Sequence, residues 1–206
     1  MRMGFVAGAW MIGCTVGFAA MDAPRQQVDW KSMLPMVRLA VRHEFPKVVA
    51  QVHYPPSILR TADLDDGVSV AVVDLGTGGF IEEMTVMRLE GATPVAARFR
   101  QRDDKIGPLV FSSGVSEGEG EVVELVPNDH AVFAAHWKRE GTKLKKCGGE
   151  AYQWDSSAKN FGFEKKLSKA MTREFCQKVE AQMVNAPAGL APLPPVATGD
   201  SAPVPR

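Results

Sequence analysis

The sequence predicts an α+β domain in which an antiparallel β-meander is packed by an N-terminal and a C-terminal helix. Three observations favour this fold. Short β-patterned runs follow one another between residues 68 and 154, and each ends in a turn. Helical periodicity is confined to the two flanks of that region. Finally, strands do not alternate with helices as they do in a parallel βαβ sheet.

The first 20 residues have the features of a secretory signal peptide. Arg2 precedes an uncharged, mostly apolar run over Met3–Met21, and cleavage is expected after Ala19 or Ala20. Two alternatives stay open. The run is long enough to remain as a membrane anchor, and Met-Ile-Gly-Cys at residues 11–14 resembles a bacterial lipobox with Cys14 as the lipidated residue. We expect a periplasmic or extracellular protein, with an envelope-anchored form as the alternative.

After the signal peptide we expect one β-rich domain over residues 21–183 and a disordered tail over residues 184–206. The tail holds six of the 14 prolines and almost no charge, so burial cannot offset the entropy of ordering it. The whole chain has 24 basic and 24 acidic residues, for a formal net charge of zero. This balance excludes a global attraction to nucleic acids or acidic membranes.

Two helices are predicted. Ser32 is expected to cap the first, over about Met33–Glu44, which ends before Pro46. A short strand over Val48–Val52 follows. The second helix is expected over about Ser168–Met183, again with a serine cap. Its apolar residues recur every four positions and form one stripe for packing on the sheet: Leu167, Met171, Phe175 and Val179.

The stretch Val68–Arg102 has the strongest strand pattern. A buried strand over Val68–Val73 is interrupted by a glycine-rich segment, and a hairpin follows with Gly91-Ala92 as its two-residue loop. The loop places Glu90 opposite Thr93. One face of the hairpin is then apolar, with Arg88 opposite Val95, Val86 opposite Ala97 and Met84 opposite Phe99; the other is charged, with Thr85 opposite Arg98 and Glu83 opposite Arg100.

Further along, Ser112–Gly120 is predicted to be a flexible loop. Short strands are expected on both sides of this loop. They are predicted over Leu109–Phe111, Glu121–Val126, Ala131–Trp137, Thr142–Lys146 and Ala151–Trp154.

The segment Val73–Gly79 resembles the first motif of S-adenosylmethionine-dependent methyltransferases and, more distantly, the phosphate-binding Asp-x-Gly-Thr of actin-like ATPases. The resemblance implies cofactor binding by Asp74, Gly76 and Gly78. Such a site requires a helix directly after the turn. Only Phe80–Glu83 precedes the next strand-like run, which favours a bend between two strands. A methyltransferase is therefore the alternative function.

No metal, cofactor or catalytic residue is predicted. Asp63–Gly67 resembles the Asp-rich calcium turns of secreted FG-GAP β-propeller repeats, but its spacing favours a plain turn. His130 and His136 share a strand face without a clear third ligand for zinc. A Ser-His-Asp site is compatible with the composition, since such triads follow geometry and not sequence order. The chain contains no Gly-x-Ser-x-Gly elbow and no P-loop.

A disulfide is predicted between Cys147 and Cys176, the two cysteines left after Cys14 is removed with the signal peptide. The alternative is a pair of buried free thiols. A crosslink that closes a loop of this length is expected to stabilise the fold by roughly 3–4 kcal/mol. It would hold the C-terminal helix against the sheet.

Two basic surfaces are the candidate binding sites. One is the hairpin carrying Lys138, Lys143 and Lys145, and the other is the sheet face carrying Arg98 and Arg100. The alternative for the lysines is that they neutralise the glutamates of the neighbouring strand, at positions 117, 119, 121 and 124. The expected partner is an unknown protein or an anionic ligand and not a nucleic acid. Membrane contact is expected only through an uncleaved or lipidated N-terminus.

The layout of signal, helix, Asp-Gly turn, meander and closing helix, with Cys-Gly-Gly-x-x-Tyr-x-Trp at residues 147–154, resembles that of small exported bacterial proteins of unknown function. The resemblance covers roughly residues 63–182 and implies no catalytic residue. We therefore expect an exported, non-catalytic binding or interaction module of unknown ligand. The alternatives are the methyltransferase and an envelope-anchored structural protein that uses its tail as a tether.

Overall fold

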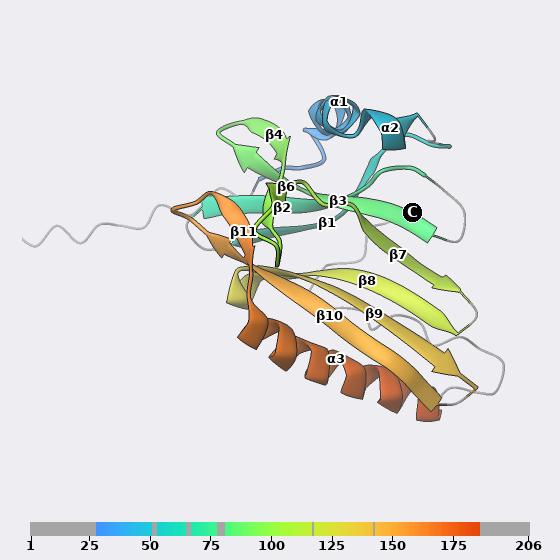
Figure 1. The fold of residues 1–206 in the computed structure, drawn as a ribbon. Coiled ribbons are helices and arrows are strands. Elements are labelled where there is room, and N and C mark those ends of the chain that lie inside the picture. Colours follow the sequence, from blue (N-terminus) through green and yellow to red (C-terminus); the bar gives the residue numbers. More distant parts are fainter. Residues whose placement is uncertain are drawn as a thin grey trace, which may run out of the picture.

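The computed structural model describes residues 28–50, 53–64, 67–77, 81–116, 118–141 and 143–185. The predicted signal peptide, the lipobox and nearly all of the predicted tail lie outside the described residues. Within the described part, the fold is the predicted α+β type: one helix at each end encloses a sheet-rich middle (Figure 1). None of the helices in the described ranges is long and apolar enough to cross a membrane.

Three helices and eleven strands make up the described domain. The helices are α1 (Leu34–Glu44), α2 (Pro46–Val49) and α3 (Lys165–Asn185). The strands are β1 (Ser57–Leu64), β2 (Val68–Asp74), β3 (Ile81–Glu90), β4 (Thr93–Ala96), β5 (Phe99–Arg100), β6 (Ile106–Gly107), β7 (Phe111–Ser116), β8 (Glu119–Val126), β9 (Ala131–Glu140), β10 (Lys143–Asp155) and β11 (Asn160–Phe163).

All strands belong to one sheet in the order β1-β2-β3-β7-β8-β9-β10-β11-β5-β6, and β4 also pairs with β3. Every pairing is antiparallel except that of β11 with β5. Figure 1 shows that the sheet bends into two layers. Helix α1 lies on the outside of the β2–β3 layer, and α3 lies on the outside of the β8–β10 layer.

The core between the two layers is centred on Phe99 of β5. Its ring stacks on Phe161 at 5.2 Å and meets Phe111 and Tyr152 edge-on at 5.4 and 5.3 Å between ring centroids. Side chains from both layers surround these rings, including the fully buried Val72 of β2. Offset-stacked and edge-on geometries are the favoured arrangements of aromatic rings. The centre of the core is thus a residue of β5, a strand of only two residues.

Two outer cores fix the helices to the sheet. Val37 and Val41 of α1 pack on the outer face of β2 and β3. The apolar stripe predicted for the last helix is confirmed, because Phe175 and Val179 of α3 are buried against β8, β9 and β10. The strands β2 and β3 are consequently covered on both faces, one by the inner core and one by α1.

The predicted hairpin register holds near the turn and is wrong beyond it. Glu90 pairs with Thr93 and Arg88 with Val95, as expected. The Ala97 amide still donates to the Val86 carbonyl (2.8 Å), and the two strands separate after it, so that Phe99 joins β11 and Met84 pairs with Phe111 instead. The predicted charged face is also wrong at Thr85, which is fully buried and donates a hydrogen bond to the carbonyl of Leu109 (2.9 Å).

Both predicted serine caps are wrong. Helix α1 begins at Leu34 without a side-chain cap, and the Ser32 hydroxyl instead donates to the carbonyl of Asp29. Ser168 lies inside α3, where its hydroxyl accepts a hydrogen bond from the Ala151 amide (2.8 Å). A serine hydroxyl can form a hydrogen bond with any nearby backbone group. Ser32 uses a backbone group of its own turn, and Ser168 uses a backbone group of β10, in place of a free amide at a helix N-terminus.

Three predicted segments differ from the structure. Val48 and Val49 of the strand expected over Val48–Val52 belong to helix α2, which Pro46 can initiate because its missing amide is not needed in the first turn, while residues 51 and 52 lie outside the described ranges. The loop expected over Ser112–Gly120 contains most of β7 and the start of β8. The two strands expected on either side of Gly148-Gly149 are one continuous strand, β10.

Candidate functional site

The methyltransferase-like turn connects two antiparallel strands, β2 and β3; it is described up to Thr77, and Gly78 lies outside the described residues. The Asp74 carboxylate is buried and accepts a hydrogen bond from the Gly76 amide (2.8 Å), while the Gly76 carbonyl accepts from the His53 amide (2.9 Å). Strand β3 begins at Ile81 and pairs antiparallel with β2. The arrangement therefore differs from a nucleotide site, in which a helix follows the turn and leads to a parallel strand.

The hairpin lysines are neutralised by neighbouring carboxylates to a large extent. Lys138 Nζ lies 3.2 Å from Glu119 Oε2 on the adjacent strand, and Lys145 Nζ lies 2.9 Å from Glu140 Oε2. Lys143 is exposed and stands opposite Glu140 in the β9–β10 register. Of the glutamates named in the alternative, Glu119 pairs with the hairpin through Lys138, whereas the partner of Lys145 is Glu140 of the hairpin itself.

The second predicted surface is remote from the first. Arg98 and Arg100 are exposed, and Arg100 aligns through Gly162 with Gln153 of β10. Gln153 lies ten positions after Lys143 along β10, which is roughly 33 Å at the rise of an extended strand. The structure does not bring the five predicted binding residues together.

Arg100 lies at a shallow pocket of about 360 Å³ on the outer face of the sheet. Gly162 permits this position, because a Cβ at that residue would lie 3.2 Å from Arg100 Nη2. Within the described ranges Arg100 forms no ion pair. The remaining walls of the pocket are Gln153, Trp154, Asp155, Ser156, Phe163 and Glu164.

The two carboxylates of this pocket are held by backbone amides. Asp155 Oδ1 accepts hydrogen bonds from Ser157 and Ala158, each at 3.0 Å. Glu164 Oε1 accepts from the Lys166 amide at 3.0 Å, at the start of α3. Both carboxylates therefore have partners other than Arg100.

Next to this pocket, the first half of α3 carries four exposed cations: Lys165, Lys166, Lys169 and Arg173. We call these residues the α3 basic face. The first turn of the helix contains no acidic residue. In the part of the chain that the structure describes, none of the four cations forms an ion pair. A groove of about 340 Å³ runs between Lys166, Lys169 and Arg173, with Ala170 also lining it.

The α3 basic face was missed in the sequence reasoning, although a signal for it exists. Lys166, Lys169 and Arg173 are spaced by three and four residues, which places them on one side of a helix. The same periodicity, applied to charge, would have identified the face.

A network of a hydrogen bond and an ion pair lies at the edge of the inner core near β5. The buried Tyr152 hydroxyl donates to Glu150 Oε2 (2.5 Å), and Glu150 Oε1 lies 3.0 Å from Arg102 Nε. Burial raises the pKa of Tyr152 well above its ordinary value, and the hydrogen bond to Glu150 adds to this. The Arg102 guanidinium also lies over the Phe163 ring, 4.5 Å from its centroid. All of these polar groups have partners inside the protein.

The described residues contain no group of three or more histidine, cysteine, aspartate and glutamate side chains that could hold a metal ion. His130 occupies a left-handed turn position before β9, and His136 lies within β9 next to Gly148. Asp65 and Asp66 of the proposed calcium turn lie outside the described ranges.

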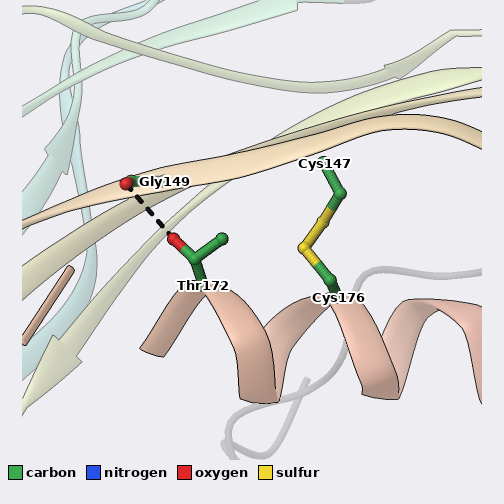
Figure 2. The surroundings of a disulfide bond; sticks show 4 residues. All are labelled: Cys147, Gly149, Thr172 and Cys176. Atoms are coloured by element: carbon green, nitrogen blue, oxygen red, sulfur yellow. Dashed lines mark hydrogen bonds between the residues drawn. A yellow bond between two sulfur atoms is a disulfide. The ribbon is translucent and has the colours of Figure 1, made fainter. Parts of the chain in front are cut away.

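The predicted disulfide is present. Cys147 of β10 is bonded to Cys176 of α3. One helical turn earlier, Thr172 Oγ1 donates to the Gly149 carbonyl (3.3 Å) from the same side of the helix, as Figure 2 shows. These two links fix the helix that carries the basic face against the outer face of β10.

Comparison of the chain with protein-family models, with curated proteins and with solved structures finds no match.

Proposed function

We propose that the protein is an exported binding module, and that the α3 basic face together with Arg100 binds an anionic partner. The observation that carries the proposal is the concentration of exposed cations at the start of α3 that form no ion pair in the described ranges. The hairpin surface supports the proposal less well, because Lys138 and Lys145 already have carboxylate partners.

The position of these cations on the helix strengthens the proposal. Lys165 and Lys166 lie in the first turn, at the positive end of the helix dipole. A cation at this end is unfavourable by about 0.3–1 kcal/mol at low ionic strength. A bound anion would interact favourably with both the side chains and the dipole. Residues that oppose local stability are commonly found where function requires them.

Export is supported by the disulfide, since such bonds persist mainly in oxidising compartments. The intact mass of the protein isolated from cells tests this part of the proposal. A mass lacking residues 1–19 or 1–20 is expected for a cleaved signal peptide. A retained or lipidated N-terminus would favour the envelope-anchored alternative instead.

Salt elution from a sulfate cation exchanger tests the location of the binding face. The variant Lys166→Glu with Lys169→Glu is compared with a matched control, Lys143→Glu with Lys145→Glu, which changes the net charge by the same amount. We expect the α3 variant to elute at clearly lower salt than the hairpin control. Equal shifts for the two variants, or a larger shift for the hairpin, would refute the proposed location.

A further inference from the structure

The α3 basic face has the shape of a row. Lys166, Lys169 and Arg173 follow one side of the helix, and each step along it is about 5 Å at the helical rise. The row begins beside the Arg100 pocket, whose wall ends at Glu164, the residue before α3. Positive charges are therefore repeated along a line instead of converging on one point.

A groove of about 340 Å³ lies along this row. Lys166, Lys169 and Arg173 form its sides, and Ala170 is the small residue among them. Long basic side chains can lay their methylene stems along such a groove while their charged ends remain in water. A thin chain lying in the groove would have cationic groups on both sides.

The exposed side of α3 lacks groups for other kinds of anionic partner. Its large apolar residues Phe175, Val179 and Met183 are buried against the sheet. In the described ranges, the exposed large apolar side chains lie on other elements: Met36, Leu39, Tyr54, Leu59, Ile106 and Val110. Insertion into a membrane interface uses exposed apolar residues, and binding of single-stranded nucleic acid uses exposed aromatic rings. Neither group is present on the α3 basic face, and the Trp154 and Phe163 rings at the Arg100 pocket are partly buried.

We infer that the partner is a linear polyanion with regularly repeated charges, such as a phosphate, sulfate or carboxylate polymer, which lies along α3 from Arg100 to Arg173. This inference rests on the proposed function and specifies the chemistry of the ligand. Binding of this kind is driven by the release of counterions and depends steeply on salt. Several weak contacts along one chain also add up to a higher affinity than one such contact provides alone.

Isothermal titration of the full chain with tripolyphosphate and with long-chain polyphosphate tests the inference. We expect the long chain to bind at least about tenfold more tightly per molecule. Replacing Lys166 and Lys169 by glutamine should reduce the slope of log affinity against log salt by about 2, one for each lost contact. The Lys143→Gln with Lys145→Gln variant is the matched control and should retain the wild-type slope.

The outcomes distinguish the polyanion inference from the proposed anionic site on α3. If tripolyphosphate binds as tightly as the long chain and the lysine dependence persists, the polyanion inference is overturned and the anionic site on α3 stands. If neither probe binds, both proposals are overturned. A single-stranded oligonucleotide that binds more tightly than polyphosphate of equal charge would also overturn the inference. Thermal unfolding of each variant shows that losses of binding do not reflect losses of folding.

Discussion

The ring of Phe133 on β9 lies against the backbone of Gly149 on β10. A Cβ on this glycine would stand 2.5 Å from Phe133 Cε2 and 2.9 Å from the Ala134 carbonyl oxygen. The Phe133 ring in turn meets Phe175 of α3 at 6.0 Å between centroids. Gly149 therefore allows the aromatic layer that carries α3 to lie close to the sheet.

The substitution Gly149→Ala should destabilise the protein. The added methyl group forces the Phe133 ring or the β9 backbone to move, and overpacking of this kind costs about 1–3 kcal/mol. Denaturant unfolding measures the change. Gly107→Ala is the matched control, because a Cβ at Gly107 meets no atom within 4 Å. Equal stability of the two variants would show that the contact is easily relieved.

Replacing Cys147 and Cys176 by serine should lower the free energy of unfolding by roughly 3–4 kcal/mol, since the crosslink closes a 29-residue separation. Reducing agent should bring the wild type to the stability of the double variant and should leave the variant unchanged. If the free energy of unfolding of the wild type does not change after the unfolded protein has been treated with reductant, the two cysteines are free thiols.

The stability of the protein should respond to Glu124. Burial raises the pKa of this carboxyl group, and Lys178 and Arg60 partly oppose the shift. Because the pKa of Glu124 is higher in the folded state than its unfolded value of 4.5, the protonated group contributes its full stabilisation at pH values below 4.5. This stabilisation is lost as the pH rises through the folded-state pKa. Glu124→Gln should therefore gain stability relative to the wild type between about pH 4 and about pH 7. Denaturant unfolding at both pH values measures the change, with the exposed Glu180→Gln as the control. A constant difference between Glu124→Gln and the wild type at the two pH values would contradict this expectation.

The variant Tyr54→Phe leaves Tyr152 as the last of the two tyrosines. Because burial and the hydrogen bond to Glu150 raise its pKa, Tyr152 should ionise well above the ordinary value of 10.0. Alkaline titration followed by phenolate absorbance gives the midpoint. A midpoint near 10, with the fold intact by circular dichroism, would show that Tyr152 is accessible to water and not held by Glu150.

Several features were predictable because they depend on neighbours in the sequence. The positive φ of Gly91 and the pairing of Glu90 with Thr93 follow from the chemistry of a two-residue turn. The disulfide followed from the even number of cysteines after Cys14, and the apolar stripe of α3 followed from helical periodicity. Each of these signals is complete within a short stretch or a simple count.

Other features depend on partners that are distant in the sequence. A strand pattern of period two is the same whichever strand lies beside it, so nothing local indicated that Phe99 leaves its hairpin for β11. The burial of Thr85 on the supposedly charged face likewise depends on the carbonyl of Leu109, 24 residues away.

The α+β class, the terminal helices and the covalent link from Cys147 to Cys176 can be predicted without coordinates, because periodicity, turn chemistry and cysteine count are local or compositional properties. Which cations are neutralised depends on the folded arrangement of the strands and helices. Lys138 lies beside Glu119 because β8 and β9 are neighbours, whereas Arg100 and the cations in the first half of α3 form no ion pair within the described ranges, where backbone amides hold Asp155 and Glu164. Coulomb energy falls with distance, so the availability of a charge depends on the fold and not on composition.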